Sequence, residues 1–488
     1  MKLSELTKGL PVINKNQSMD PNVLGITHDS RDVKKGYLYI ALKGQLHDGN
    51  SFISEAIRKG CIGVISEVST SVPDEIALLV IKNLRFHMAQ LAQRFYSYPD
   101  QSLVLIGITG TNGKTTTTTI IQQILSLSGH PTGLIGTIQN IAGKIKQESI
   151  RTTPESTDFF HWLRKSLDEG DLYTSVEVSS IGLEMNRVEG VRFAIGAFTN
   201  LTHDHLDFHG DMERYFMSKL RLMNQSIKFI TNIDDPYGQR IKEIGSVITL
   251  GINSKADYHV SDLIMSPTGT KFNFATPKGF YSLKSPLIGT FNVYNLAFAL
   301  AIYSELGFDL DSLQPILDNL VGAKGRFEKI IISPSQPFGV LVDYAHTPDA
   351  LEKICTEGKK LITGKARLHI LFGCGGNRDK TKRAEMARIV SKYADVIWHT
   401  SDNPRDEDVD TILDDASVGF EFEKLHNPNI YHRIPDRSEA VTKAIEDLVE
   451  GDLLIMAGKG HETYQEIHGI KYPYNDKECA ERTLRKRL

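Results

Sequence analysis

The sequence predicts an α/β protein of several domains, in which short buried strands alternate with helices. A chain of 488 residues is too long for one hydrophobic core, so two to four domains are expected. From Leu103 onward, short apolar runs alternate with segments of helical periodicity, a pattern typical of a mostly parallel sheet covered on both faces. Several predicted strands end in loops rich in Gly, Asp, His or Arg, and such sheets place their sites at the carboxyl ends of strands.

Composition excludes some classes of function. The formal net charge of −4 provides neither the basic surface of a nucleic-acid-binding protein nor that of a membrane-binding one. The four cysteines show no Cys-x-x-Cys spacing and indicate the reduced thiols of a cytoplasmic protein. Met1 is followed by no long apolar run, so neither a signal peptide nor a transmembrane helix is predicted.

Changes in pattern along the chain suggest three α/β domains. Residues 1–98 contain a short series of strands and helices, and residues 99–102 have the composition of a linker. Residues 99–329 form the central series. The glycine-rich, basic segment 322–328 is a candidate hinge, and residues 330–488 begin a second α/β series.

A glycine loop between a strand and a helix is the strongest local signal. The apolar run Val104–Ile108 predicts a buried strand, and apolar residues recur at helical spacing after Thr119. The loop itself consists of Gly110, Thr111, Asn112, Gly113, Lys114, Thr115 and Thr116. Such a loop directs backbone N–H groups and a helix N-terminus toward phosphate. Lys114 can then contact the terminal phosphates, and the Thr115 hydroxyl can bind Mg²⁺. The strict pattern has glycine where this chain has Ile108, but the context favours a nucleotide site over a structural turn.

Two further strand ends carry groups suited to catalysis or metal binding. The predicted strand Tyr173–Val178 contains Glu177, whose carboxylate needs a partner such as phosphate-bound Mg²⁺ or, alternatively, a salt bridge at a sheet edge. The predicted strand Phe193–Phe198 leads into a loop with His203, Asp204, His205, Asp207 and His209. That density indicates metal binding or acid–base chemistry, and a solvated loop without a function is the alternative.

Helices are expected next to these loops. Ser156 is a candidate N-cap for a helix over Thr157–Leu167, and residues 211–222 predict a helix that carries Lys219. An apolar helix is expected over Leu296–Tyr303, with Gly289–Asn295 leading into it.

Polar loops also follow strands in the outer domains. In the first domain, the turn 43–49 follows a predicted strand, and its pattern fits a plain loop and a ligand-binding mouth equally well. In the last domain, predicted strands lead into Gly373–Lys380, Thr400–Arg405 and Gly458–Glu462. Because carboxyl ends of parallel strands meet at one edge, these three loops are expected to form one site.

Ten motifs occur in a fixed order along nearly the whole chain. They are GTNGKTT, TTP, EVSS, TNLTHDHLDFHG, FNVYNLAFA, GRFE, DYAHTPDAL, GCGGNRDKTKR, DNPR and AGKGHE. This set resembles the Mur ligases. The resemblance implies a UDP-binding N-terminal domain, a central P-loop ATPase domain and a C-terminal Rossmann-like domain that binds the incoming amino acid.

The resemblance also implies an activity. It is ATP-dependent amide formation, through an acyl phosphate, between UDP-N-acetylmuramoyl-L-alanyl-D-glutamate and meso-diaminopimelate in peptidoglycan precursor synthesis. Mg²⁺ and ATP are the implied cofactor and co-substrate, and a cytoplasmic monomer without nucleic-acid or membrane partners is expected. The alternatives are the same reaction with L-lysine, another ligase of this fold such as the next Mur ligase or a folylpolyglutamate synthase, and a regulatory ATPase without a third-substrate pocket.

The implied site residues fall into sets. ATP would be held by the glycine loop Gly110–Thr116 with Asn295, Arg326 and Asp343. The UDP-muramoyl-dipeptide would be held by His28, Ser30, Gln45, Leu46, His47, Thr152, Thr153, Ser179 and Arg187. The metal ligands would be Thr115, Glu177, His205 and Lys219, with Lys219 as N6-carboxylysine, and the catalytic set would be Lys114, Lys219 and His205. An unmodified Lys219 would repel Mg²⁺, whereas addition of CO₂ gives a carbamate anion. A plain surface lysine is the alternative at that position.

The amino-acid pocket would contain Arg378, Asp402, Asn403, Pro404, Arg405, Gly458 and Glu462. Relatives that add meso-diaminopimelate carry Asn-Pro-Arg at this place, whereas relatives that add L-lysine generally lack the arginine. A bidentate arginine suits the additional carboxylate of diaminopimelate and would repel the ammonium group of lysine. The resemblance therefore implies diaminopimelate as the third residue.

Overall fold

The computed structural model describes residues 1–15, 20–44, 47–266, 269–333, 335–420 and 430–488. The chain forms two compact units. Unit 1 contains Met1–His259, Ala275–Gly279 and Asn295–Leu313, and unit 2 contains Val260–Phe274, Phe280–Tyr294 and Gln314–Leu488. Three larger sheets lie within residues 12–81, 104–285 and 328–457. The predicted domain boundaries at 98 and 329 stay predictions.

The first sheet belongs to the N-terminal part of unit 1. Its strands have the order β1-β5-β4-β3-β2, in which β1 is antiparallel to β5 and the others are parallel. The strands are β1 (Val12–Lys15), β2 (Gly25–Thr27), β3 (Tyr37–Ala41), β4 (Gly63–Ser66) and β5 (Ala77–Ile81). The helices are α1 (Leu3–Leu6), α2 (Ile53–Arg58) and α3 (Leu84–Phe95).

The second sheet is organised around β6 (Val104–Thr109), which precedes the glycine loop. The strand order is β16-β15-β14-β13-β12-β11-β6-β10-β7-β8-β9, and β7, β10, β6, β11, β12 and β13 are parallel neighbours. The other strands are β7 (Thr132–Ile135), β8 (Gln139–Ala142), β9 (Ile145–Glu148), β10 (Tyr173–Glu177), β11 (Phe193–Phe198), β12 (Ser226–Asn232), β13 (Ile248–Gly251), β14 (Tyr258–Ser266), β15 (Gly269–Thr276) and β16 (Gly279–Ser285). The helices of this region are α4 (Lys114–Leu127), α5 (Ser156–Asp168), α6 (Ser180–Glu184), α7 (Leu206–His209), α8 (Met212–Asn224), α9 (Pro236–Ile244), α10 (Thr290–Glu305) and α11 (Gln314–Leu317).

Two expectations about helix starts are wrong. Helix α5 begins at Ser156, and its N-cap position is occupied by Glu155. The Ser156 hydroxyl donates instead to the carbonyl of Arg187 at 3.0 Å, because a tertiary partner competes with the local cap. Helix α10 begins at Thr290, so Asn295 lies inside the helix rather than before it.

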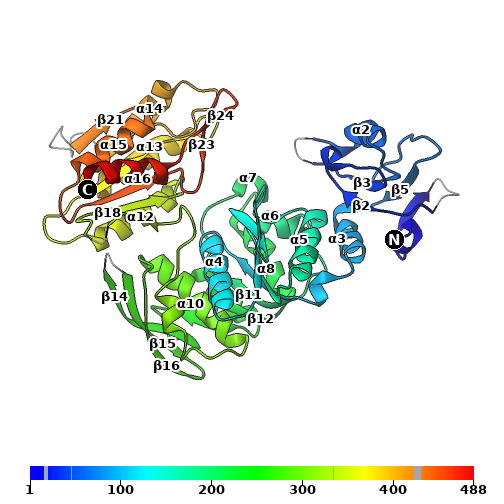
Figure 1. Ribbon diagram of the computed structural model, residues 1–488, viewed down its shortest axis with the longest axis horizontal. Helices are drawn as coiled ribbons and strands as arrows, with labels where there is room; N and C mark the ends of the chain where they lie inside the picture. The colour runs from blue at the N-terminus through cyan, green and yellow to red at the C-terminus, as the bar shows by residue number, and fades with distance from the viewer. Residues whose placement is uncertain (16–19, 45–46, 267–268, 334, 421–429) are drawn as a thin grey trace. The chain divides into compact units, whose positions relative to one another are not determined.

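The third sheet, in unit 2, has the order β17-β18-β22-β19-β20-β21, with only β17 antiparallel. Its strands are β17 (Glu328–Lys329), β18 (Gly339–Asp343), β19 (Leu368–Phe372), β20 (Val396–His399), β21 (Tyr431–Arg433) and β22 (Leu453–Ala457), and β23 (Tyr464–Ile467) pairs with β24 (Ile470–Pro473) as a separate hairpin. The helices are α12 (Pro348–Leu361), α13 (Thr381–Tyr393), α14 (Val409–Ser417), α15 (Arg437–Asp447) and α16 (Asp476–Arg487) (Figure 1).

Both faces of this third sheet are buried. In β22, Ile455 packs into the cluster that contains α12 and α13, whereas Leu454 and Met456 pack into the cluster with α15 and α16. Successive side chains of a strand point to opposite faces, so a strand covered on both faces reads as a continuous apolar run. This explains why strands could be predicted directly before Gly373, Thr400 and Gly458, where β19, β20 and β22 end.

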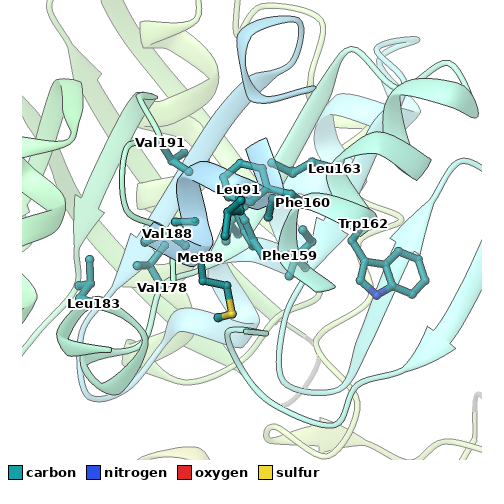
Figure 2. Close-up of a cluster of buried hydrophobic side chains, with 14 of the residues drawn as sticks. Met88, Leu91, Phe159, Phe160, Trp162, Leu163, Val178, Leu183, Val188 and Val191 are labelled. Atoms are coloured by element: carbon teal, nitrogen blue, oxygen red, sulfur yellow. The ribbon is translucent and has the colours of Figure 1, made fainter. Parts of the chain in front are cut away.

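The core of unit 1 joins its two sheets. One buried cluster runs from Leu3 to Ile241 and includes side chains from α3 and α5. Figure 2 shows Met88 and Leu91 of α3 beside Phe159 and Phe160 of α5. The N-terminal strands therefore share a hydrophobic core with the sheet that carries the glycine loop. Among the described helices, none combines the length and the apolar character needed to span a bilayer.

Removal of the Phe160 ring should destabilise unit 1. The ring is fully buried, so Phe160→Ala should lower the free energy of unfolding by about 3–5 kcal/mol, through lost burial and a cavity. Phe280→Ala is the matched control, because that ring is 64% exposed. Urea unfolding followed by circular dichroism measures both. Equal losses in the two variants would contradict the described packing.

Candidate functional site

Three loops meet at one edge of the second sheet. Strand β6 lies between β10 and β11, and all three are parallel. Their carboxyl ends therefore lie side by side, which places the end of β10 at Glu177, the glycine loop after β6 and Thr199–Thr202 after β11 at the same edge. The predicted nucleotide loop and the predicted metal ligand Glu177 thus come together.

Asn200, which follows β11, holds the glycine loop through two hydrogen bonds. The Thr111 N–H donates to the Asn200 carbonyl at 2.8 Å, and the Asn112 N–H donates to Asn200 Oδ1 at 3.0 Å. These two amides are therefore engaged within the protein. An anion would meet the N-terminus of α4, which begins at Lys114 and carries the partial positive charge of the helix dipole.

Two lysines donate to the same carbonyl oxygen. Lys114 Nζ lies 2.9 Å from Gly110 O, and Lys219 Nζ lies 2.8 Å from it. Lys219 is 1% exposed, so the surface lysine considered from the sequence is wrong. Burial lowers the pKa of Lys219 well below its usual value, and the charge of Lys114 lowers it further. Burial therefore disfavours the charged form of the Lys219 amine.

Aromatic side chains surround this amine. Lys219 Nζ lies 4.5 Å from the centre of the Tyr215 ring, and His209 stacks on that ring at 5.0 Å. His205 approaches the ring edge-on at 6.2 Å. Burial lowers the pKa of His205, the carboxylate of Asp204 opposes this effect, and the two lysines reinforce it. A neutral imidazole is the form that can ligate a metal.

Glu177 is buried and held by hydroxyl groups. Its Oε2 accepts from Thr115 Oγ1 at 2.8 Å and from Thr137 Oγ1 at 3.0 Å, and its Oε1 accepts from the Thr137 N–H at 2.7 Å. No basic side chain in the described part of the chain forms an ion pair with it, so the salt-bridge alternative is wrong. A buried carboxylate beside a hydroxyl group is a donor set that suits Mg²⁺.

No preformed metal cage accompanies this pair. Within the residues that the structure describes, no cluster of three or more His, Cys, Asp or Glu side chains surrounds a common point. Mg²⁺ usually binds through one or two carboxylates together with phosphate oxygens and water, so Glu177 and Thr115 fit such an ion without a cage.

The predicted dipeptide-binding residues form one hydrogen-bonded network with Glu177. Thr153 Oγ1 donates to the Glu177 carbonyl at 2.8 Å and lies 3.0 Å from Ser179 Oγ. Thr152 Oγ1 lies 3.0 Å from Thr137 Oγ1 and donates to it, because the one hydroxyl hydrogen of Thr137 is used on Glu177. The network brings three predicted residues against the carboxyl end of β10.

Arg187 belongs to a charged cluster that the motifs did not reveal. Glu155, which is 3% exposed, accepts from Arg187 at 2.8 Å, from Arg151 at 2.8 Å and from Arg85 at 2.9 Å. Burial raises the pKa of Glu155, but the charges of the three arginines outweigh it and hold the pKa below its usual value. One carboxylate faces three guanidinium groups, which leaves an excess of positive charge beside the dipeptide residues.

The other N-terminal candidates lie near this cluster or are exposed. His28 Nδ1 lies 2.8 Å from Thr157 Oγ1 on the first turn of α5, and Ser30 Oγ donates to Glu55 at 3.1 Å. His47 is exposed. Gln45 and Leu46 lie outside the described residues.

Asn295 lies against the glycine loop although it is distant in sequence. Its Oδ1 accepts from Thr117 Oγ1 at 3.2 Å, and a Cβ atom at Gly113 would come within 2.5 Å of it. Gly113 also has a φ of +90°, so the loop requires glycine there for two reasons.

In unit 2, the remaining ATP candidates surround Tyr344. The Arg326 guanidinium lies 4.7 Å from the centre of the Tyr344 ring, and His461 lies 5.1 Å from it. Asp343 accepts from the N–H groups of Phe327 and Ala345, each at 2.7 Å. Burial raises the pKa of Asp343, and the charge of Arg326 partly opposes this shift.

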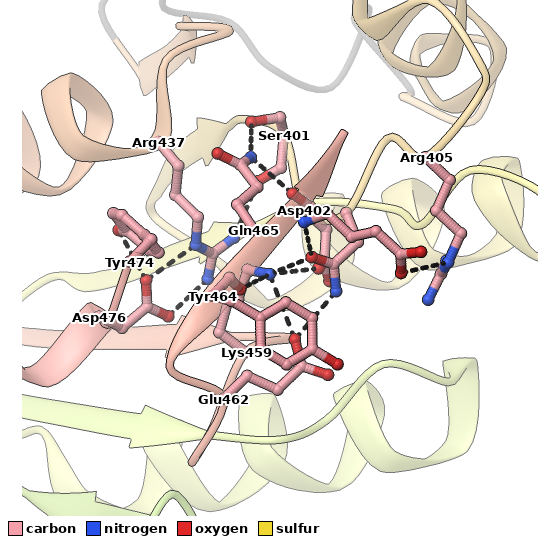
Figure 3. Close-up of polar contacts among 12 residues, drawn as sticks. Ser401, Asp402, Arg405, Arg437, Lys459, Glu462, Tyr464, Gln465, Tyr474 and Asp476 are labelled. Atoms are coloured by element: carbon pink, nitrogen blue, oxygen red, sulfur yellow. Dashed lines mark hydrogen bonds and ion pairs between the residues drawn. The ribbon is translucent and has the colours of Figure 1, made fainter. Parts of the chain in front are cut away.

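The amino-acid candidates gather at the carboxyl ends of β19, β20 and β22. A Cβ atom at Gly376 would lie 1.8 Å from the Pro404 carbonyl oxygen, so the glycines let the two loops touch. Arg405 donates through Nε to Glu466 at 3.2 Å (Figure 3). Its Nη1 donates to the Gly376 carbonyl at 2.8 Å. Asn403 Nδ2 donates to Glu462 Oε2 at 2.9 Å. Arg405 is thus an oriented residue rather than a solvated one.

The amino-acid candidates that remain are Asp402, Gly458 and Arg378. Gly458 has a φ of +109°, and a Cβ atom there would come within 2.8 Å of Asp402 Oδ2. Arg378 is exposed, and its side chain lies near Gly375. The loops expected to form one site are therefore adjacent.

Comparisons with known proteins agree with this geometry. The Mur ligase middle domain matches residues 108–303, and the Mur ligase glutamate ligase domain matches residues 325–460. A protein named UDP-N-acetylmuramoyl-L-alanyl-D-glutamate--2,6-diaminopimelate ligase, from Geobacillus thermodenitrificans, is 39% identical over 100% of both chains. The chain belongs to the Mur ligase family. The resemblance inferred from the motifs and the predicted fold class are both confirmed.

Two solved structures of Mur ligases match this chain over nearly its whole length. A structure of the same-named diaminopimelate ligase has a TM-score of 0.71 and 32% identity, covering 100% of this chain and 99% of the other. A MurF ligase from Thermotoga maritima in complex with ADP has a TM-score of 0.66 at 19% identity, covering 95% and 98%, which shows the fold alone.

Gly110→Ala should weaken ATP binding to this Mur ligase. The new Cβ atom would lie 1.9 Å from Thr199 Oγ1 at a φ of +143°, and Gly110 O is also the acceptor for both lysines. We expect an affinity loss of about tenfold or more, because the Thr199 hydroxyl or the loop itself must move to relieve the overlap. Titration with a fluorescent ATP analogue measures it.

Gly129→Ala is the control for that experiment. Gly129 follows α4, the helix after the glycine loop, and has a φ of +83°. Nothing lies within 4 Å of its Cβ position. It should lose stability by about 1 kcal/mol and keep ATP affinity. Equal effects of the two substitutions on ATP binding would refute the role of the loop contact.

Proposed function

We propose that this chain joins meso-diaminopimelate to UDP-N-acetylmuramoyl-L-alanyl-D-glutamate and converts ATP to ADP and phosphate. The observation that carries the proposal is Arg405, whose guanidinium is held by Glu466 and the Gly376 carbonyl at the predicted amino-acid pocket. Its Nη2 has no hydrogen-bond partner among the described residues. An oriented guanidinium edge suits a carboxylate, which diaminopimelate carries at the end where lysine has only an ammonium group.

ATP makes the substrate carboxylate reactive. A carboxylate is a poor acyl donor, and phosphorylation converts it to an acyl phosphate with a good leaving group. Lys114 and the N-terminus of α4 lie where they can offset the charge of the transferring phosphoryl group. The amine of the amino acid then attacks, and phosphate leaves from the tetrahedral intermediate. The glycine loop lies in unit 1 and the Arg405 loop in unit 2.

Mg²⁺ is the proposed metal, with Thr115, Glu177, His205 and the carbamate of Lys219 as its candidate ligands. When bound, it supplies positive charge that stabilises the phosphoryl oxygens. Glu177 provides a buried carboxylate for this purpose, and the burial of His205 favours its neutral, ligating form.

Lys219 is proposed to act as a carbamate. Carbamylation needs a neutral amine, and the burial of Lys219 lowers its pKa in that direction. The amine attacks CO₂, a C–N bond forms, and the proton leaves to water. The product is an anion beside Lys114, which offsets the charge repulsion between the two lysines.

The nucleotide-sugar substrate is proposed to bind along the N-terminal part of unit 1. Its diphosphate and carboxylate groups are anionic, and the excess of positive charge around Glu155 favours such groups. We assign His28, Ser30, Thr152, Thr153, Ser179 and Arg187 to this substrate. The proposal also includes domains divided near residues 98 and 329, and a cytoplasmic monomer as the working form.

The test of the reaction is phosphate release with ATP, Mg²⁺ and UDP-N-acetylmuramoyl-L-Ala-D-Glu, comparing meso-diaminopimelate with L-lysine. We expect release with diaminopimelate and none above background with L-lysine. In Arg405→Ala, KM for diaminopimelate should rise about 10- to 100-fold, the loss of a charge-assisted pair, while KM for ATP stays unchanged.

Release with L-lysine instead would keep the ligase assignment and refute the Arg405 argument. Release with neither amino acid would favour another acceptor in the same fold or a regulatory ATPase. Arg433→Ala serves as the control, because the Arg433 guanidinium pairs with Asp410 and Asp414 of α14 and with none of the proposed pocket residues, so the variant should leave all three KM values unchanged.

The carbamate is tested separately. Lys219→Ala should lose activity by at least about 100-fold, and short carboxylates such as acetate should restore part of it by replacing the anion. Wild-type protein labelled with ¹³C-bicarbonate should show a carbamate ¹³C signal that Lys219→Arg lacks. The exposed Lys242 provides the control, and Lys242→Ala should keep full activity. Full activity in Lys219→Ala would remove Lys219 from the site.

A further inference from the structure

A buried lysine joins the two loops of the amino-acid pocket. Lys459 follows strand β22, and its side chain is 0% exposed. Its ammonium donates to Asn403 Oδ1 at 2.5 Å, to the Tyr464 carbonyl at 2.8 Å and to Glu462 Oε2 at 3.2 Å. Figure 3 shows Lys459 at the centre of these contacts. None of the motifs assigned this residue a role.

The partners of Lys459 come from the ends of two different strands. Asp402 and Asn403 follow β20, whereas Glu462 and Tyr464 follow β22. Asp402 Oδ1 lies 3.4 Å from the same ammonium. One cation therefore connects three side chains of the proposed diaminopimelate pocket. Because it is fully buried, Lys459 acts on the substrate only through these side chains.

The ammonium also fixes which atoms its partners present. Asn403 Oδ1 accepts from Lys459 and from the Glu466 N–H at 2.9 Å, so Asn403 Nδ2 faces Glu462. Glu462 Oε2 accepts from both Asn403 and Lys459. Glu462 Oε1 has no hydrogen-bond partner among the described residues, and it is the oxygen that remains for an incoming ammonium group.

Electrostatics requires a cation at this position. Asp402 and Glu462 place two carboxylates around one buried point, where like charges repel strongly. Lys459 offsets both. Without it, Glu462 loses the attraction that holds it next to Asn403, and the two loops lose a shared anchor.

A second buried cation holds the backbone beneath the pocket. Arg437 donates to the Ser401 carbonyl at 3.1 Å and to the Ala457 carbonyl at 2.9 Å, the residues that directly precede Asp402 and Gly458. Asp476 pairs with Arg437, and both side chains are fully buried. Arg437 thus fixes the strand ends, which leaves the placement of the pocket side chains to Lys459.

We propose that Lys459 is a positioning residue for the incoming amino acid. Its ammonium orients Glu462 and Asn403 so that Glu462 Oε1 can bind an ammonium group of a diamino acid. This inference rests on the proposed function, because it assumes that the pocket binds the third substrate.

The test is steady-state kinetics of Lys459→Met, a neutral side chain of similar length, with each of the three substrates varied in turn. We expect KM for the amino acid to rise at least tenfold, with KM for ATP and for the nucleotide-sugar substrate within twofold of wild type. Lys459→Arg, which keeps the charge, should recover part of the loss. The measurement uses the amino acid that wild type accepts, so a wild type that rejects diaminopimelate but accepts another acceptor changes the proposed function and not this test.

Two controls separate positioning from general destabilisation. Ile455→Val removes a core methyl group from β22, the strand that precedes Lys459, and lowers stability. Its three KM values should match wild type although its Tm is lower. If Lys459→Met does not fold, Lys459→Gln takes its place, because its amide can still donate to Asn403 or the Tyr464 carbonyl, and KM for the amino acid should again rise at least tenfold. An unchanged KM for the amino acid in a folded variant, or equal changes in all three KM values, would overturn the inference.

Discussion

The carbonyl oxygen of Gly110 accepts hydrogen bonds from Lys114 and Lys219, and the chemistry of unit 1 depends on this shared contact. Two ammonium groups cannot stay charged on one buried oxygen without a large cost, so either one amine is neutral or anions arrive to offset the charge. The low pKa of Lys219 is the first solution. The second solution is an anion beside the two lysines, such as a phosphate group or the proposed carbamate. The same contact explains why the glycine loop must keep its backbone where Asn200 holds it, because a displaced Gly110 carbonyl would release both lysines.

Unit 2 uses the opposite arrangement of charge. Its proposed pocket contains two carboxylates, Asp402 and Glu462, and the cations Lys459 and Arg437 are both fully buried. Both units apply the same geometric rule, since parallel neighbouring strands bring their carboxyl ends to one edge. They differ in what the loops at that edge carry. Unit 1 presents positive charge, which suits the phosphates of ATP and of the nucleotide-sugar substrate. Unit 2 presents oriented groups of both signs, which suits an amino acid with ammonium and carboxylate groups.

Strand ends and strong motifs could be predicted because their causes are local. Strands such as Phe193–Phe198 and Leu453–Ala457 are covered on both faces and read as apolar runs, and the glycine loop has a fixed spacing. The start of α5 could not be predicted, since the Ser156 hydroxyl bonds to Arg187, 31 residues away in sequence, instead of capping its own helix. The cluster around Glu155 was missed for the same reason. Its arginines lie at positions 85, 151 and 187, and no spacing rule connects them.

The sequence by itself determined the α/β class, the order of the motifs and the family, because these follow from residue type and spacing along the chain. The tertiary structure decided the states of the side chains. It made Lys219 a buried amine rather than a surface lysine, gave Glu177 hydroxyl partners rather than a salt bridge, and placed Lys459 between two loops. The physical reason is that burial, pKa and hydrogen-bond partners depend on groups brought together by sheet packing, and a one-dimensional pattern carries no measure of that proximity.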